Sequence, residues 1–156
     1  MNSALVALAV MVGRIVLDSL AGYALARLEF RGRNGGFLLI IGTLMIPAIV
    51  LIIPRFIVLK QLGMLGTYQG LIVPFAADAF GIFLMKQFFA SIPKEIEEAA
   101  KIDGASRFRM FFQVILPMAR PALAALAIFS FQGTWNGFVD PLIIAANNQD
   151  IWTLWP

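Results

Sequence analysis

The sequence of 156 residues contains no cysteine and no histidine. Without cysteine, the chain can form no disulfide and offers no thiolate to a metal or a substrate. The lack of histidine removes the most common general base and the most common neutral metal ligand. No G-x-x-x-x-G-K-[ST] motif occurs, so the chain has no P-loop for a nucleotide. We therefore expect neither an enzyme nor a protein with a metal or cofactor of its own.

Charge is also scarce. Charged residues make up 13% of the chain, where about 25% is usual for a soluble domain, and hydrophobic residues make up 60%. Twelve basic and nine acidic residues are too few to cover the surface of a compact soluble fold. The net charge is only +3, and the basic residues form short clusters between apolar runs, which is not the pattern of a nucleic-acid-binding surface. We expect lipid, and no nucleic acid, around this chain.

Four apolar stretches are long enough, or nearly so, to cross about 30 Å of hydrocarbon. They cover approximately residues 4–28, 36–53, 68–85 and 121–141. Each is mostly apolar on all sides, whereas a helix at the surface of a soluble protein would have a polar face. The sequence therefore predicts an all-α fold: a multi-pass membrane helix bundle of about four spans, forming one domain over 1–156.

The basic residues predict the orientation of the bundle. Two of them, Arg55 and Lys60, lie between the second and third spans, whereas nine lie in the other two connections: Arg27, Arg31, Arg33, Lys86, Lys94, Lys101, Arg107, Arg109 and Arg120. Connections rich in Lys and Arg stay in the cytoplasm. The loop 27–35 and the segment 86–117 are therefore predicted to be cytoplasmic, and residues 55–66 to form an external connection with a short helix.

The cytoplasmic segment 86–117 is predicted to be a hairpin of two short helices. Ser91 is a candidate N-cap for the first helix, and Gly104 is a candidate stop, because glycine accepts the left-handed conformation of a C-terminal cap. Ser106 would cap the second helix and Pro117 would end it. The hairpin has two possible roles. It either lies at the interface and only joins two spans, or it docks onto a partner protein.

The pattern of the hairpin assigns its faces. In the first helix, one side carries Ile92, Ile96, Ala99 and Ala100, and the other carries Lys94, Glu97, Glu98 and Lys101. In the second helix, a stripe at helical spacing consists of Phe108, Phe111, Phe112 and Ile115. The small Ala99 and Ala100 would let a partner surface approach closely, with the charge of Glu98 at the edge.

Several polar residues lie inside the predicted spans, where an unpaired charge is costly. Arg14 and Asp18 are one helical turn apart, and we favour a self-neutralising pair over a role in substrate passage. Asp78, four residues after the helix-kinking Pro74, is either a functional acid or a hydrogen-bonding partner of a neighbouring helix. A cluster in the fourth span is either part of a sugar path or an interhelical hydrogen-bond patch: Gln132, Thr134, Trp135 and Asn136. Trp135 could also belong to an aromatic belt.

One motif identifies a family resemblance. Glu98-Ala99-Ala100, three residues, Gly104, nine residues and then Val114-Ile115-Leu116-Pro117 resemble the EAA signature of binding-protein-dependent ABC import permeases, E-A-A-x3-G-x9-I-x-L-P. Val114 replaces the isoleucine. The stretches AGYALAR (21–27), QFFASIPK (87–94) and AKIDGAS (100–106), together with Trp135-Asn136-x-Phe138-x-x-Pro141-Leu142, are similar to the carbohydrate-transporting, maltose-type branch. The resemblance covers nearly the whole chain.

The resemblance implies a function. The EAA segment would be a coupling helix seated in a cleft of a separate ATPase subunit, with Glu98, Ala99, Ala100, Gly104, Leu116 and Pro117 at the contact and turn positions. Asp78, Gln132, Trp135 and Asn136 are candidates for the translocation path. The implied partners are an ATPase dimer, a second permease subunit, an extracellular or periplasmic solute-binding protein and a sugar, and the implied location is the bacterial inner membrane.

The chain also departs from the family pattern. Family members usually have six spans and nearly twice this length, so we expect this chain to be truncated at both ends. Gly137 and Asp140 stand where this branch often has an acidic and an aromatic residue. Two alternatives to a working permease subunit therefore remain, a truncated permease without function and an ATP-independent helical scaffold or channel.

Overall fold

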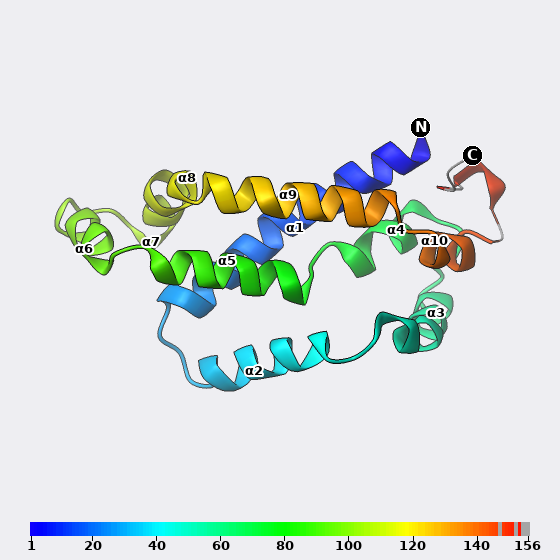
Figure 1. Ribbon diagram of the computed structural model, residues 1–156, viewed down its shortest axis with the longest axis horizontal. Coiled ribbons are helices and arrows are strands. Elements are labelled where there is room, and N and C mark those ends of the chain that lie inside the picture. Colours follow the sequence, from blue (N-terminus) through cyan, green and yellow to red (C-terminus); the bar gives the residue numbers. More distant parts are fainter. Residues whose placement is uncertain (147, 152, 154–156) are drawn as a thin grey trace.

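The structure is a computed structural model that describes residues 1–146, 148–151 and 153, and every regular element in that part of the chain is a helix. The predicted all-α class is confirmed. Three helices form the body of the bundle (Figure 1): α1 (Asn2–Arg27), α5 (Ala79–Ser91) and α9 (Arg120–Trp135). α1 packs along both α5 and α9, and it includes residues 4–27 of the first predicted span, 4–28.

The region of the second predicted span, 36–53, is bent rather than straight. α2 (Arg33–Leu44) is followed by η1 (Ala48–Leu51) and α3 (Ile52–Gln61), and the two halves meet at 98°. Pro47 lies between them, and a proline disfavours the helical conformation of the residue before it. Pro54, at the predicted end of the span, lies instead in the first turn of α3, where its missing N–H breaks no helical hydrogen bond.

The region of the third predicted span is broken near its middle. α4 (Tyr68–Ile72) and η2 (Val73–Phe75) are separated from α5 by a short break at which Asp78 is extended, with φ −142° and ψ 138°. α5 continues beyond residue 85 because Phe89 is completely buried in the core. Ser91 is therefore the last residue of α5, and the prediction that it caps the next helix is wrong; its hydroxyl donates to the Phe88 carbonyl.

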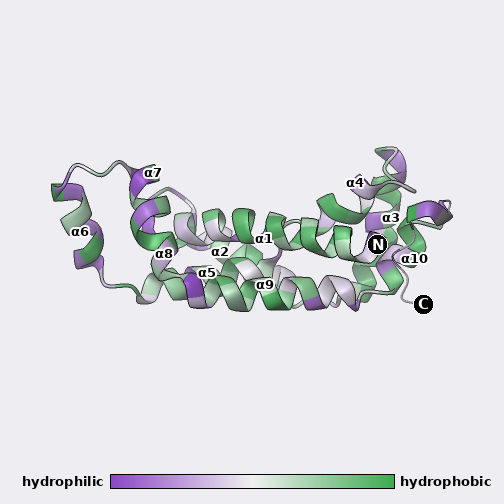
Figure 2. Cartoon of the chain, turned by 90° about the horizontal axis from the view of Figure 1, so that it is seen from above, coloured by the Kyte–Doolittle hydropathy of each residue, from purple (hydrophilic) through white to green (hydrophobic). Residues whose placement is uncertain are grey.

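The cytoplasmic segment of the prediction lies at one end of the bundle. It comprises α6 (Lys94–Ile102), α7 (Arg107–Arg109), the π-helical η3 (Met110–Ile115) and α8 (Leu116–Met118), and α9 then leaves at an angle of 78°. At the opposite end of the bundle lie α10 (Val139–Ile144) and η4 (Gln149–Ile151), the last elements in the described part of the chain. Figure 2 shows hydrophilic residues concentrated at the α6–α7 end and apolar residues along the body.

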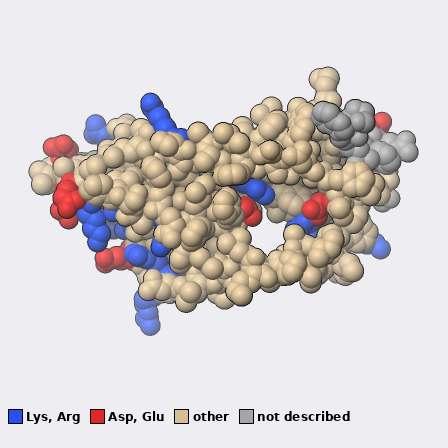
Figure 3. Space-filling model, in the orientation of Figure 1, with Lys and Arg blue, Asp and Glu red and all other residues tan. Residues whose placement is uncertain are grey.

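Among the residues that the structure describes, two helical stretches are long and apolar enough to cross a membrane. They are α1 and the 24 residues Tyr68–Ser91, and the number rises to four if each of two bent helix pairs is one span. In α2 every residue is at least partly exposed, and Figure 3 shows an opening between the α2–α3 arm and the rest of the molecule. The α2–α3 arm therefore presents an apolar surface that is suited to lipid or to another helix.

The apolar side chains that are buried in the described part of the chain form two clusters, one at each end of the bundle. The inner cluster, next to α6, joins α1, α5, η3 and α9 through Tyr23, Met85, Phe89, Phe111, Ile115 and Leu126, among others. The outer cluster joins α1, α3, α4 and α10 through Val6, Val10, Leu59, Leu71 and Ile144, among others. α1 contributes to both clusters and thus connects the two ends of the molecule.

Candidate functional site

The α6 helix ends in a tight turn. Gly104 has φ +77°, a left-handed conformation that glycine adopts without steric cost. The Ala105 N–H donates to the Ala100 carbonyl over 2.9 Å, which caps the helix in the manner of a Schellman motif. Ser106 then caps α7, since its hydroxyl accepts from the Arg109 N–H over 3.3 Å. The predicted helix stop at Gly104 and the predicted cap at Ser106 are confirmed.

The signature residues of α6 divide between two environments. Glu98 and Ala99 are exposed at the end of the molecule, whereas Ala100 is half-buried against the inner cluster. Exposed apolar side chains flank the turn, with Ile102 at 86% and Phe108 at 77% exposure. This end of the molecule also carries a dense group of acidic and basic side chains (Figure 3). α6 therefore presents a small, mixed polar and apolar surface to a partner.

The second half of the signature lies where the chain enters α9. Leu116 is half-buried against the inner cluster, and Pro117 is exposed in α8. In the predicted aromatic stripe, Phe111 is buried, whereas Phe108 and Phe112 are exposed, so the stripe is only half correct. The reason is the π-helical turn of η3, whose wider hydrogen-bonding pattern shifts the faces away from the α-helical period.

Arg27 joins α1, α5 and α6 at one point. Its guanidinium donates to the Phe89 carbonyl, over 3.1 Å from Nε and 2.6 Å from Nη2, and Nη2 also donates to the Ile92 carbonyl. Its Nε lies 3.1 Å from Oε1 of Glu97 in α6, and the two side chains are 5% and 10% exposed. The sequence pattern groups Glu97 with Lys94, Glu98 and Lys101 on the charged side of the helix, but in the structure those three are exposed and Glu97 turns inward to a buried cation.

Arg14 and Asp18 do not form the predicted pair. Nε of Arg14 donates to the Phe75 carbonyl over 2.9 Å, and Oδ1 of Asp18 accepts from the Asp78 N–H over 3.0 Å. The carboxylate within ion-pair distance of Arg14 is that of Asp78, with Nη1 and Oδ2 3.9 Å apart. These two side chains of α1 thus bind the backbone on each side of the break between η2 and α5.

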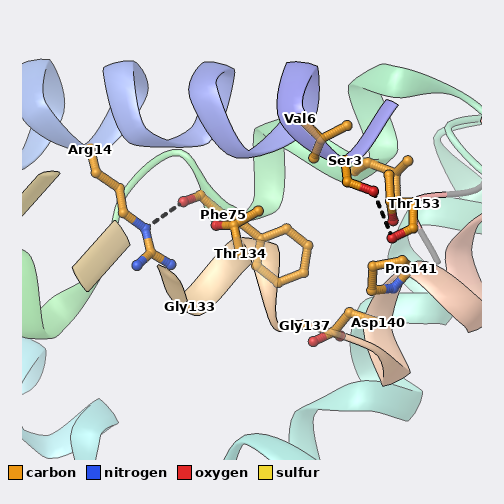
Figure 4. A pocket seen from close by; sticks show the side chains of 11 residues that line it. Ser3, Val6, Arg14, Phe75, Gly133, Thr134, Gly137, Asp140, Pro141 and Thr153 are labelled. Carbon is orange, nitrogen blue, oxygen red and sulfur yellow. Dashed lines mark hydrogen bonds between the residues drawn. The ribbon is translucent and has the colours of Figure 1, made fainter. Parts of the chain in front are cut away.

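Next to this cluster, a pocket of about 240 Å³ opens between α1, η2, α9 and α10 (Figure 4). Its walls carry a cation, a carboxylate, a hydroxyl and an aromatic ring, supplied by Arg14, Asp140, Thr134 and Phe75. Asp140 forms an ion pair with Arg55 of α3, whose guanidinium lies 4.6 Å from the centre of the Phe75 ring. Hydrogen-bonding groups beside an aromatic face suit a polyhydroxylated ligand.

The predicted path residues do not meet in this pocket. Gln132 and Asn136 are exposed, and Trp135 stacks on Phe131 with ring centroids 5.5 Å apart. Asp78 is half-exposed and borders a shallow apolar depression beside α2. From the same turns of α9, the pocket receives Gly133 and Thr134 instead. The sequence shows that Arg14 and Asp140 are charged residues beside or within predicted spans, but it does not show the long-range contacts that bring them to one pocket.

Comparison with known proteins gives a consistent match. Residues 18–155 match a family described as binding-protein-dependent transport system inner membrane component. The diacetylchitobiose uptake system permease protein NgcG of Streptomyces coelicolor is 42% identical over 99% of this chain and 51% of its own length. The arabinooligosaccharides transport system permease protein AraQ of Halalkalibacterium halodurans is 37% identical over 98% of this chain and 54% of its own length.

Two further matches are proteins whose names give other transported compounds. The sn-glycerol-3-phosphate transport system permease protein UgpE of Pectobacterium atrosepticum is 42% identical over 94% of this chain and 52% of its own length. A crystal structure of a bacterial ABC transporter involved in the import of the acidic polysaccharide alginate superposes with a TM-score of 0.89 at 30% identity. It covers 97% of this chain and 54% of the matched chain. The chain thus spans about half the length of the relatives it matches.

Proposed function

This chain belongs to the family of binding-protein-dependent transport system inner membrane components, and on that premise we propose that it is a permease subunit of a bacterial ABC importer for a sugar or oligosaccharide. It lies in the inner membrane as a multi-pass protein and catalyses no reaction itself. A separate ATPase dimer hydrolyses ATP, a second permease subunit completes the path, and a solute-binding protein delivers the sugar. Closure of the ATPase dimer displaces α6 and alternates access to the path.

The exposed end of α6 carries this proposal. A coupling element has to be rigid, joined closely to the spans and open to a partner. α6 meets these requirements. Gly104 fixes its end, and only two residues separate its first residue from the end of α5. Glu98 and Ala99 are exposed to a partner. Ala100 and Leu116 pack against the inner cluster and hold the base of the segment against the bundle, while Pro117 lies exposed near the turn into α9. Docking at Glu98 and Ala99 would therefore transfer movement of the ATPase to the helices.

The pocket between α1 and α9 supports a sugar as the cargo. Carboxylate, guanidinium and hydroxyl groups beside an aromatic ring can bind several hydroxyls of one small ligand. We place the start of the path at this pocket, with Asp78 beside it at the helix break. Gln132, Trp135 and Asn136 lie on the adjoining surface of α9, where we expect the second permease subunit to complete the path.

Capture of the ATPase subunit tests the coupling role directly. The chain is co-expressed with a candidate ATPase and a candidate second permease subunit, purified in detergent and assayed for bound ATPase. We expect Glu98→Lys to abolish capture, because it reverses the charge at the exposed edge of α6. Glu95→Lys is the matched control, since Glu95 is also exposed on this helix but lies outside the signature. Equal capture by both variants would contradict the proposal.

The cargo is tested in proteoliposomes that contain the assembled importer and its solute-binding protein. The probes are labelled diacetylchitobiose, an arabinooligosaccharide and sn-glycerol-3-phosphate. We expect ATP-dependent uptake of at least one saccharide, and we expect Asp140→Asn to reduce it while ATPase capture is unchanged. An assembled complex that takes up none of the three probes would refute the assignment of a sugar of these kinds as the cargo. A chain that inserts into the membrane but captures no ATPase would favour the alternative of a truncated, inactive permease.

A further inference from the structure

Arg27 stands out because it connects a helix that is remote in sequence to the coupling segment. α6 is continuous with α5 through Ile92 and Pro93, and with η3 through residues 103–109, but no such short connection joins it to α1. The Arg27–Glu97 ion pair supplies that link, over 70 residues of sequence. Both side chains are nearly inaccessible to solvent, so the contact is shielded from salt and water.

The same guanidinium holds the end of α5. The last carbonyls of a helix have no partner within it and carry a partial negative charge. Arg27 donates to two carbonyls at this end, those of Phe89 and Ile92. The Phe89 carbonyl also accepts from the Ile92 N–H, so the guanidinium adds a second donor there and complements the helix dipole. With Glu97 bound as well, Arg27 fixes the angle at which α6 leaves α5. Rotation of α6 about Ile92 and Pro93 would have to break this contact.

α1 extends from this junction to the far pocket without a break. Arg27 is its last residue, and Arg14, thirteen residues earlier, lines the pocket. At 1.5 Å per residue, the two positions lie about 20 Å apart along one helix. α1 also packs along α5 and α9, so a displacement of its inner end moves a continuous, rigid element.

We propose that Arg27 is a positioning residue for transport, and that its ion pair with Glu97 transmits the displacement of α6 to α1 and thereby to the pocket at the opposite end. This inference rests on the proposed coupling function of α6. Without the pair, the ATPase would still dock on the exposed side of α6, but α1 would no longer follow the movement. Docking and transmission are therefore separable properties of this chain.

The absence of cysteine makes this separation measurable. Thr134→Cys places a single thiol of this chain in the pocket, in a complex whose other subunits have been made cysteine-free. The readout is the rate at which a membrane-impermeant maleimide modifies this thiol, as a ratio with and without ATP and vanadate. Bound ATPase is measured on the same samples. The variants are Arg27→Gln and Glu97→Gln, and the matched controls are Arg31→Gln and Glu95→Gln, which remove the same charges from exposed positions.

We expect the nucleotide to change the modification rate in the parent protein and in both controls. Arg27→Gln and Glu97→Gln should each reduce this change by roughly tenfold, the size of a typical coupling between sites, while ATPase capture stays the same. Glu97→Gln is the decisive variant, because it leaves the bonds of Arg27 to Phe89 and Ile92 in place. A full response in that variant would overturn the proposal.

Two other outcomes are also informative. If both variants fail to assemble while their controls assemble, the pair is structural only, and the proposal is wrong. If the parent chain captures no ATPase, the proposed function fails, and the inference fails with it. A positioning role is supported if the two variants capture the ATPase but lose the response of the modification rate to nucleotide, while the controls keep both the capture and the response.

Discussion

Asp18 in α1 accepts a hydrogen bond from the backbone N–H of Asp78, 60 residues away, with 3.0 Å between Oδ1 and N. Asp18 is completely buried, and Asp78 is the residue at which the second long helical stretch resumes as α5. One turn earlier in α1, Arg14 binds the Phe75 carbonyl on the other side of the break. The break thus has a donor and an acceptor supplied by a neighbouring helix, which meets the requirement that backbone groups inside a membrane be satisfied.

Substitution of Asp18 should show how much this hydrogen-bond acceptor contributes to the free energy of unfolding. Asp18→Leu removes the acceptor of the part-buried Asp78 N–H, and a donor left unsatisfied away from water costs about 1–3 kcal/mol. We expect that loss in the free energy of unfolding, measured by reversible SDS unfolding in mixed micelles. Asp18→Asn retains an acceptor oxygen of similar size and should lose much less. Equal losses in the two variants would show that the carboxylate charge, and not the hydrogen bond, stabilises the break.

Gly22 permits the close approach of α1 and α5. A Cβ at this position would lie 2.7 Å from Cβ of Met85 and 2.9 Å from the Lys86 backbone nitrogen. Because the obstacle includes backbone, Gly22→Ala should force the helices apart and lower the free energy of unfolding by about 1–3 kcal/mol. Gly42→Ala in α2 is the matched control, since a Cβ there meets nothing within 4 Å. There we expect no loss and a gain of up to about 1 kcal/mol from helix propensity.

The effect of substituting Gly104 should come from its backbone conformation alone, and not from steric contact. No atom lies within 4 Å of a Cβ built at this position, but its φ of +77° costs a side-chain-bearing residue roughly 1–2 kcal/mol. Gly104→Ala should therefore weaken ATPase binding about five- to thirtyfold, at about 1.4 kcal/mol per factor of ten. Gly104→Asn should retain more affinity, because asparagine tolerates the left-handed region. Equal weakening by the two residues, in a titration of ATPase onto the purified chain, would argue against this explanation.

The Arg55–Asp140 pair should contribute little to stability. Its side chains are 22% and 33% exposed, and pairs accessible to solvent typically contribute about 0.2–1 kcal/mol. A double-mutant cycle with Arg55→Gln and Asp140→Asn should give a coupling energy in that range, and the coupling should fall as salt is added. A coupling of several kcal/mol that resists salt would mean that this end of the bundle is shielded, as the Arg27–Glu97 pair is.

Much of this architecture can be predicted from the sequence because it depends on local patterns. The all-α class follows from long apolar runs, and the stop at Gly104 and the cap at Ser106 follow from local backbone chemistry. The break before Asp78 is harder to place. Pro74 predicts a kink, but the break occurs two to four residues later, where Arg14 and Asp18 can reach the backbone.

Contacts between residues from distant parts of the chain could not be predicted from local sequence patterns. The spacing of Arg14 and Asp18 suits a pair within one helix, and only the position of the broken helix shows why each binds elsewhere. Glu97 belongs to a polar face by its period, yet Arg27 lies opposite it in the fold. In the pocket, the polar cluster of α9 pointed to the correct helical turns, but Thr134 faces inward and its neighbours Gln132 and Asn136 do not.

The arrangement at the break means that the bend of one helix is specified by the sequence of another. The residues that make a straight helix unfavourable over 68–91 are not confined to Pro74 and Asp78 but include Arg14 and Asp18, about 60 residues earlier. A search for mutations that straighten or stiffen this helix should therefore include α1. Suppressors of a defect at the break should likewise arise on α1, as changes in the two residues that hold it.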